Sequence, residues 1–132
     1  MSGINLWAVL AAAVSAFVLG GLWYSPALFL KVWSLESGIG YPPPKGGHPA
    51  RVFGVAFIFS LISAFAFAWW LGPKPELEHA ARQGLYVGFG FVAASFGINY
   101  QFANRTFKLW LIDAGYHVVQ FVLYGVVLAG LS

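Results

Sequence analysis

Residues 52–71 read VFGVAFIFSLISAFAFAWWL, a run without a single charged side chain. A helix of about 20 apolar residues crosses the ~30 Å hydrocarbon core of a bilayer, because it rises ~1.5 Å per residue. Within lipid every backbone amide and carbonyl must find its partner inside the segment, which only a helix provides for an isolated span. The stretch therefore predicts a transmembrane α-helix.

Three other stretches have similar length and apolarity, and they predict three further spans. They cover residues 4–24, 80–100 and 109–131. The stretch 80–100 is the least regular of them, because Arg82 and Gln83 lie in its first turns and glycine is frequent. The sequence thus predicts an all-α integral membrane protein, with four transmembrane helices bundled in a single domain of residues 1–132.

The composition supports a membrane environment. The chain is 60% hydrophobic and 8% charged, whereas a soluble domain carries about 25% charged residues to keep its surface hydrated. A net charge of +3 spread thinly along the chain argues against nucleic acid as a partner. The absence of cysteine from the sequence excludes disulfides and thiolate metal sites.

The longest connection, between the first two predicted spans, opens SPALFLKVWSLESG at residues 25–38. We expect a short helix over about 26–37, with Ser25 as N-cap and Gly38 at its end. One side of that helix is apolar, so we expect it to lie at the membrane interface. The apolar side would carry Leu28, Phe29, Val32 and Trp33.

Lysine and arginine predict the orientation. Five of them fall in the first and third connections, against two in the second connection and the start of the third span. Because cytoplasmic loops carry the excess of positive charge, the first and third connections should face the cytoplasm and both termini the outside. The five are Lys31, Lys45, Arg51, Arg105 and Lys108, and the two are Lys74 and Arg82.

Small residues mark two packing faces. In the first span they recur at intervals of four, and the third span contains a GxxxG pair followed by two more small residues. Such stripes let helix backbones approach closely in lipid. The first stripe is Ala8, Ala12, Ala16 and Gly20, and the second is Gly84, Gly88, Ala93 and Gly97.

The fourth span contains a polar stripe, made of Asp113, His117, Gln120 and Tyr124. Their spacing of four, three and four places them within about 60° of arc on one helix face. An aspartate in the membrane interior costs about 2.5–3.5 kcal/mol, so it should face protein or a water pocket. His117 lies one turn beyond Asp113 and could share a proton with it.

Other polar residues lie at the cytoplasmic ends of the predicted spans. We therefore expect them to form one cluster with Asp113 and His117 in the cytoplasmic leaflet. Two interpretations of this cluster stay open. Asp113 could be an internal staple, bonded to Asn99, Tyr24 or Arg51, or the cluster could bind a ligand or a proton. Its candidate residues are Tyr24, Arg51, Asn99, Tyr100, Asp113, His117 and Gln120.

No catalytic or metal-binding motif is recognisable. His48, His79 and His117 fall in three different parts of the predicted topology, so they do not form a metal site. A phosphate-binding glycine loop, a nucleophile elbow and a helical HExxH motif are all missing from the sequence. We therefore expect no enzyme activity, no metal and no cofactor.

Two long motifs resemble one family. LGGLWYSPALFLKVW and NYQFANRTFKLWLIDAGYHVVQFVLYGVVLAG are similar to the bacterial membrane family called domain of unknown function 1761. The resemblance covers essentially the whole chain and implies a small four-span protein of the bacterial cytoplasmic membrane. Leu30 stands where that family has a glycine. The resemblance implies a fold and no activity.

Two classes of function fit these features. The first is a structural or interaction protein in the lipid bilayer, either a homo-oligomer or a small subunit of a membrane complex. The second is a small proton-linked transporter or ligand-binding protein that uses Asp113 and His117.

Overall fold

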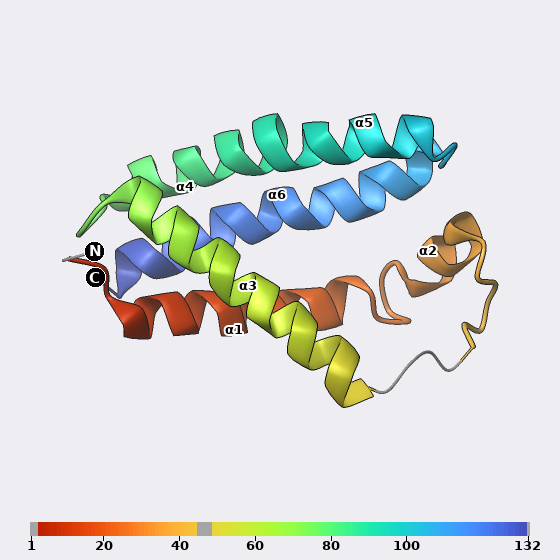
Figure 1. The fold of residues 1–132 in the computed structure, drawn as a ribbon, viewed down its shortest axis with the longest axis horizontal. Coiled ribbons are helices and arrows are strands. Elements are labelled where there is room, and N and C mark those ends of the chain that lie inside the picture. The colour runs from red at the N-terminus through yellow and green to blue at the C-terminus, as the bar shows by residue number, and fades with distance from the viewer. Residues whose placement is uncertain (1–2, 45–48, 132) are drawn as a thin grey trace.

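A computed structural model describes residues 3–44 and 49–131, so Lys45 and His48 lie outside the described residues. The regular secondary structure of the described chain is all helical, with no strand in either range. A π-helical segment, η1 (Val87–Ala93), joins two of the α-helices (Figure 1). The α-helices are α1 (Leu6–Trp23), α2 (Leu30–Ser37), α3 (Pro49–Leu71), α4 (Leu77–Tyr86), α5 (Ala94–Phe102) and α6 (Phe107–Gly130).

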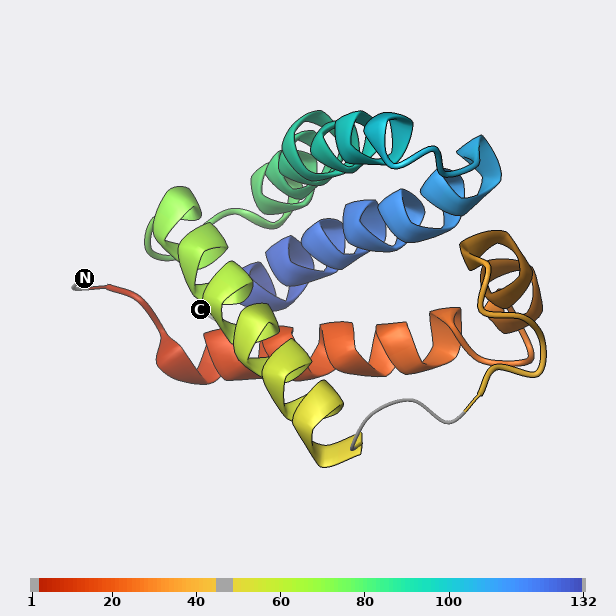
Figure 2. The same cartoon turned by 45° about the vertical axis from the view of Figure 1, so that its right-hand side comes forward.

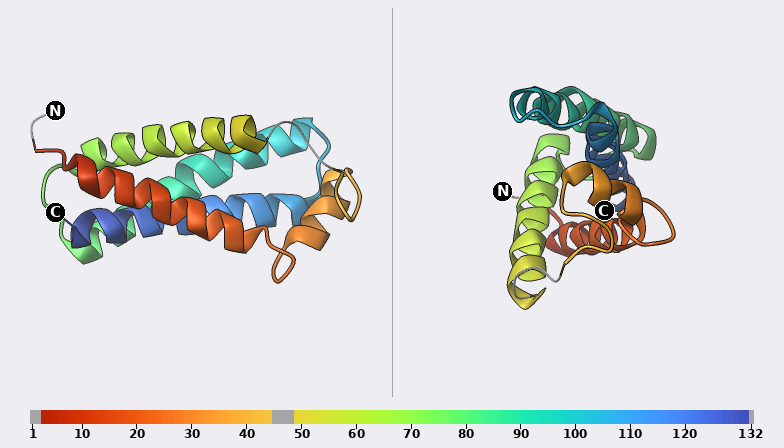
Figure 3. Two further views of the ribbon diagram at one scale, coloured as in Figure 1. Left: turned by 90° about the horizontal axis from the view of Figure 1, so that it is seen from below. Right: turned by 90° about the vertical axis from the view of Figure 1, so that its right-hand side faces the viewer.

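Helix α6 is the centre of the arrangement. It runs beside α1, and the rod formed by α4, η1 and α5 lies along its other side (Figures 1 and 3). Helix α3 crosses α1 obliquely, so its last turns approach α4 while its first turns point away from α5 (Figures 1 and 2). The start of α1 and the end of α6 meet, because Asn5 Nδ2 donates to the Leu131 carbonyl at 2.8 Å.

Three helices, α1, α3 and α6, are long and apolar enough to cross a membrane. They coincide with the spans predicted at residues 4–24, 52–71 and 109–131. Large apolar side chains face outward on them, and Trp7, for example, is 80% exposed. Soluble proteins rarely expose so large an apolar surface to water. Outward-facing apolar side chains on long helices are the pattern expected of a membrane protein.

The fourth predicted span, at residues 80–100, is not one regular α-helix. The chain is helical there, but it is divided into α4, η1 and α5, and none of these alone has the length of a span. Charged Glu78 and Arg82 form an ion pair of 3.1 Å on the exposed side of α4. Glycine lowers helix propensity, and this segment is glycine-rich, which explains why a regular α-helix is not maintained.

Helix α2 begins later than predicted, at Leu30 instead of residue 26. Ser25 does not cap it, because the Ser25 hydroxyl donates to the Leu22 carbonyl at 2.7 Å and so belongs to the end of α1. Gly38 ends the helix as expected, with φ of +90°. Only glycine adopts that backbone conformation without strain.

Helix α2 is anchored to the rest of the fold by aromatic and polar contacts. The ring of Trp33 lies 5.8 Å from that of Tyr24, edge to face. At the C-terminal end of α2, Arg105 Nη1 donates to the Ser37 carbonyl at 2.8 Å, and Thr106 Oγ1 donates to Glu36 at 2.5 Å. The α2 segment is therefore fixed to both α1 and the α5–α6 connection.

Both predicted small-residue faces are packing faces. Ala8, Ala12 and Ala16 of α1 are at most 1% exposed. A Cβ atom at Gly84 would lie 2.3 Å from the Phe121 carbonyl oxygen, and one at Gly88 would lie 2.8 Å from the Val118 Cα. The backbones of the α4–η1 segment and α6 are thus in direct contact.

Candidate functional site

Asp113 joins three helices through two tyrosines. Asp113 is half-buried on α6. One of its carboxylate oxygens accepts a hydrogen bond from the Tyr24 hydroxyl at 2.6 Å, and the other accepts one from the Tyr100 hydroxyl. Tyr24 follows the last residue of α1, and Tyr100 belongs to α5. Hydrogen bonds to an ionised acceptor are strong, and two of them offset much of the cost of placing a carboxylate in this region.

The predicted cluster is therefore only partly assembled. Tyr24, Tyr100 and Asp113 meet as expected, but Arg51 and Asn99 do not bond to Asp113 within the described chain. Arg51 is exposed in the first turns of α3, which the oblique crossing carries away from α5 (Figure 1). Asn99 is exposed on α5, because it is about 100° around the helix from Tyr100.

A second polar network runs from α6 to α3. His117 Nδ1 lies 2.6 Å from Gln120 Oε1, and Gln120 Nε2 donates to the Tyr124 hydroxyl at 2.7 Å. Tyr124 is fully buried, and its hydroxyl lies 2.8 Å from Ser60 Oγ of α3. The polar stripe of α6 thus continues to a serine that the sequence analysis did not identify.

His117 and Asp113 belong to separate networks. In residues 3–44 and 49–131, no hydrogen bond joins the His117 imidazole to the Asp113 carboxylate. The proton that the sequence suggested these two groups could share is therefore not supported by a direct contact. The imidazole is instead stacked on Phe96, with ring centres 4.9 Å apart, and it meets Tyr116 at 5.0 Å. Asp113 thus links α6 to Tyr24 and Tyr100, while His117 is placed among aromatic rings.

His117 and Gln120 line a cleft of about 340 Å³ between α1, α3, η1 and α6. Ligand pockets have volumes of about 300–1,000 Å³ and combine apolar walls with a few polar groups. The remaining lining residues fit that description: Phe17, Ala56, Phe59, Ser60, Ser63, Val92, Tyr116 and Phe121. This cleft is the strongest candidate site in the described chain.

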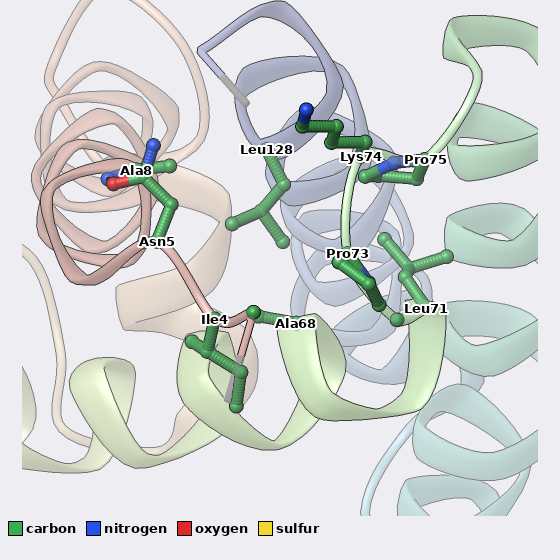
Figure 4. A pocket seen from close by; sticks show the side chains of 11 residues that line it. Ile4, Asn5, Ala8, Ala68, Leu71, Pro73, Lys74, Pro75 and Leu128 are labelled. Atoms are coloured by element: carbon green, nitrogen blue, oxygen red, sulfur yellow. The ribbon is translucent and has the colours of Figure 1, made fainter. Parts of the chain in front are cut away.

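Two other hollows help to define the site. One of about 390 Å³ adjoins the cleft at Val92 and contains Ser95 and Asn99, so Asn99 faces a neighbouring groove. The other lies where the two ends of the chain meet, among side chains that include Ile4, Pro73 and Leu128 (Figure 4). Its volume of about 20 Å³ holds about one water molecule, so it is a packing defect.

Comparison with known proteins supplies a family and no activity. A comparison with curated proteins and one with solved structures each gave no significant match. A family model, in contrast, matches residues 7–129, nearly the whole chain. The match includes both small-residue faces, the Asp113 contacts and the cleft beside His117. The chain therefore belongs to the family described as protein of unknown function (DUF1761).

Proposed function

We propose that the protein is a four-span membrane protein that binds a small lipophilic molecule in the cleft beside His117. The fourth crossing would be the continuous rod from Leu77 to Phe102, which packs along α6. A rod buried on one side by close glycine contacts can cross lipid despite its π-helical segment, because π-turns also satisfy the backbone.

One observation carries the binding proposal. His117 lines the cleft, and its Nε2, which is not sealed inside the protein, has no hydrogen-bond partner in the described part of the chain. A polar atom without a partner is costly in an apolar setting, and a bound molecule that supplies the partner recovers that cost. We propose binding and not catalysis, because we find no nucleophile placed against a base in the described residues.

Filling the cleft tests the proposal. We expect the protein isolated in a mild detergent to retain a small molecule. Native mass spectrometry should detect this molecule on the protein, and extraction with an organic solvent should release it. Ala56→Trp, which places an indole in the cleft, should remove this molecule and leave the helix content unchanged. Val55→Trp is the matched control, because Val55 is the preceding residue, is exposed and does not line the cleft. Equal retention by both variants would contradict the proposal.

A second candidate, a structural or interaction protein, is favoured by the Asp113 contacts and by α3. Two tyrosines hold Asp113 as a brace, which is a structural role. The first half of α3 is exposed along its length, and Phe53 and Ile58 are 61% and 57% exposed. This face would contact lipid, a second copy or another membrane subunit. The mass of the intact protein in lipid nanodiscs distinguishes a monomer from an oligomer or a mixed complex.

We propose that the chain lies in the bacterial cytoplasmic membrane with both termini outside. The positive charges of the first and third connections support this orientation. Because the sequence has no cysteine, single cysteines at Ile39 and Glu78, both exposed, should react with an impermeant maleimide from opposite sides. A cysteine at Phe89, exposed on η1, should stay unlabelled in lipid. Labelling of Ile39 and Glu78 from one side would exclude four crossings.

A further inference from the structure

The cleft also indicates the chemistry of its ligand. We propose that it binds a lipid-soluble phenol or quinol, whose hydroxyl group donates a hydrogen bond to His117 Nε2. This inference rests on the proposed ligand-binding function, and it adds the class of ligand. Three features of the cleft support it: the direction of its hydrogen bonds, its depth and its aromatic walls.

The hydrogen-bond network fixes which nitrogen of His117 carries the proton. Gln120 uses its amide nitrogen to donate to Tyr124, so the oxygen that it turns to His117 can only accept. His117 Nδ1 must therefore be the protonated nitrogen. In the neutral ring Nε2 then has a lone pair and no hydrogen. The ligand must accordingly supply a donor, and a hydroxyl group does so whereas an ether or a ketone does not.

The depth of the site favours an uncharged ligand. His117 is near the middle of the 24-residue helix α6, about 15 Å from its first residue at ~1.5 Å per residue. A charged group at that depth would add several kcal/mol to the free energy of binding. Phosphate, carboxylate and ammonium head groups are thereby disfavoured, and an un-ionised hydroxyl remains suitable.

The walls favour an aromatic ring over an aliphatic chain. Phe17, Phe59 and Tyr116 line the cleft beside His117, together with Phe121. Aromatic rings interact well with one another in stacked or edge-to-face contacts. Ser63 of α3 also lines the cleft, and its hydroxyl has no hydrogen-bond partner in the described ranges, so it can donate to the ligand oxygen.

A pair of probes that differ only at the hydroxyl group tests this assignment. We would measure binding of 4-octylphenol and 4-octylanisole to the full chain in lipid nanodiscs by native mass spectrometry. The phenol should bind about tenfold more tightly, the effect of one buried hydrogen bond and of the acceptor left unpaired in the anisole complex. The aliphatic alcohol 1-dodecanol should bind more weakly than the phenol, because it lacks the ring.

Two variants separate the two polar contacts. His117→Leu should abolish the preference for phenol over anisole. Ser63→Ala should weaken both probes several-fold and leave their ratio unchanged, because both carry the oxygen that Ser63 contacts. Equal affinities in the parent protein would overturn the phenol assignment without affecting the cleft as a binding site. Equal binding of dodecanol would overturn the ring assignment. Absence of binding by all three probes, with no retained molecule, would overturn the proposed function as well.

Discussion

Replacing Gly125 by alanine should destabilise the protein by about 3 kcal/mol or more, the upper end of the range for overpacking. A Cβ atom at this position would lie 2.3 Å from the Ala80 carbonyl oxygen and 2.7 Å from the Ala80 carbonyl carbon. Both atoms belong to the backbone of α4, so no side-chain rotation can relieve the contact. The helices must separate, and the free energy of unfolding in mixed detergent micelles measures the loss.

Gly90→Ala is the matched control. Gly90 lies in η1, and a Cβ atom there would meet nothing within 4 Å. Its replacement should change the free energy of unfolding by at most about 1 kcal/mol, in the stabilising direction, because alanine is the better helix former. Equal stability of the two variants would show that α4 and α6 are not in backbone contact.

Asp113→Ala should have the second-largest effect, about 3 kcal/mol in the free energy of unfolding. The carboxylate accepts the hydroxyls of Tyr24 and Tyr100, and its removal leaves two donors inside the protein without partners. Each unsatisfied buried donor costs about 1–3 kcal/mol. Asp113→Asn retains one acceptor oxygen and should cost only about 1 kcal/mol, as expected for a residue with a bracing role.

A double-mutant cycle isolates the brace. Tyr24→Phe alone should cost about 1 kcal/mol, because the carboxylate loses one of its two donors. In the Asp113→Ala background the same change should be neutral or stabilising, since it removes a hydroxyl that is already unpaired. Additive effects of the two substitutions would mean that the tyrosine and the aspartate do not act together. Tyr86→Phe is a control, because Tyr86 is 56% exposed on α4.

Local sequence patterns predicted most of the fold because each reflects a local physical requirement. Hydropathy located α1, α3 and α6, since lipid imposes a length and an apolar surface on a helix. The spacing of small residues located the faces at Ala12 and Gly84, which are now found in close contact. The period of 3.6 residues located the polar stripe that carries Asp113 and His117.

Crossing angles and partners across helices were not predictable in the same way. Arg51 was expected near Asp113 because α3 begins at the same predicted surface, but the oblique crossing of α3 takes it elsewhere. Ser60 was missed, since a serine in an apolar helix gives no local signal of its partner. Its bond to Tyr124 depends on how α3 meets α6 in three dimensions.

The π-helical segment η1 has a consequence for insertions and deletions. A π-turn accommodates about one residue more than an α-turn, so η1 sets how far α5 is rotated relative to α4. Deleting one residue from η1 would restore regular α-helical winding, and α5 would keep the face that it now turns to α6. Deleting one residue of α5 ahead of Phe96, outside the π-turn, would instead turn the rest of α5 by about 100°, and both Tyr100 and Phe96 would leave their partners on α6. The same change in length would thus be absorbed in η1 and would disrupt the site in α5.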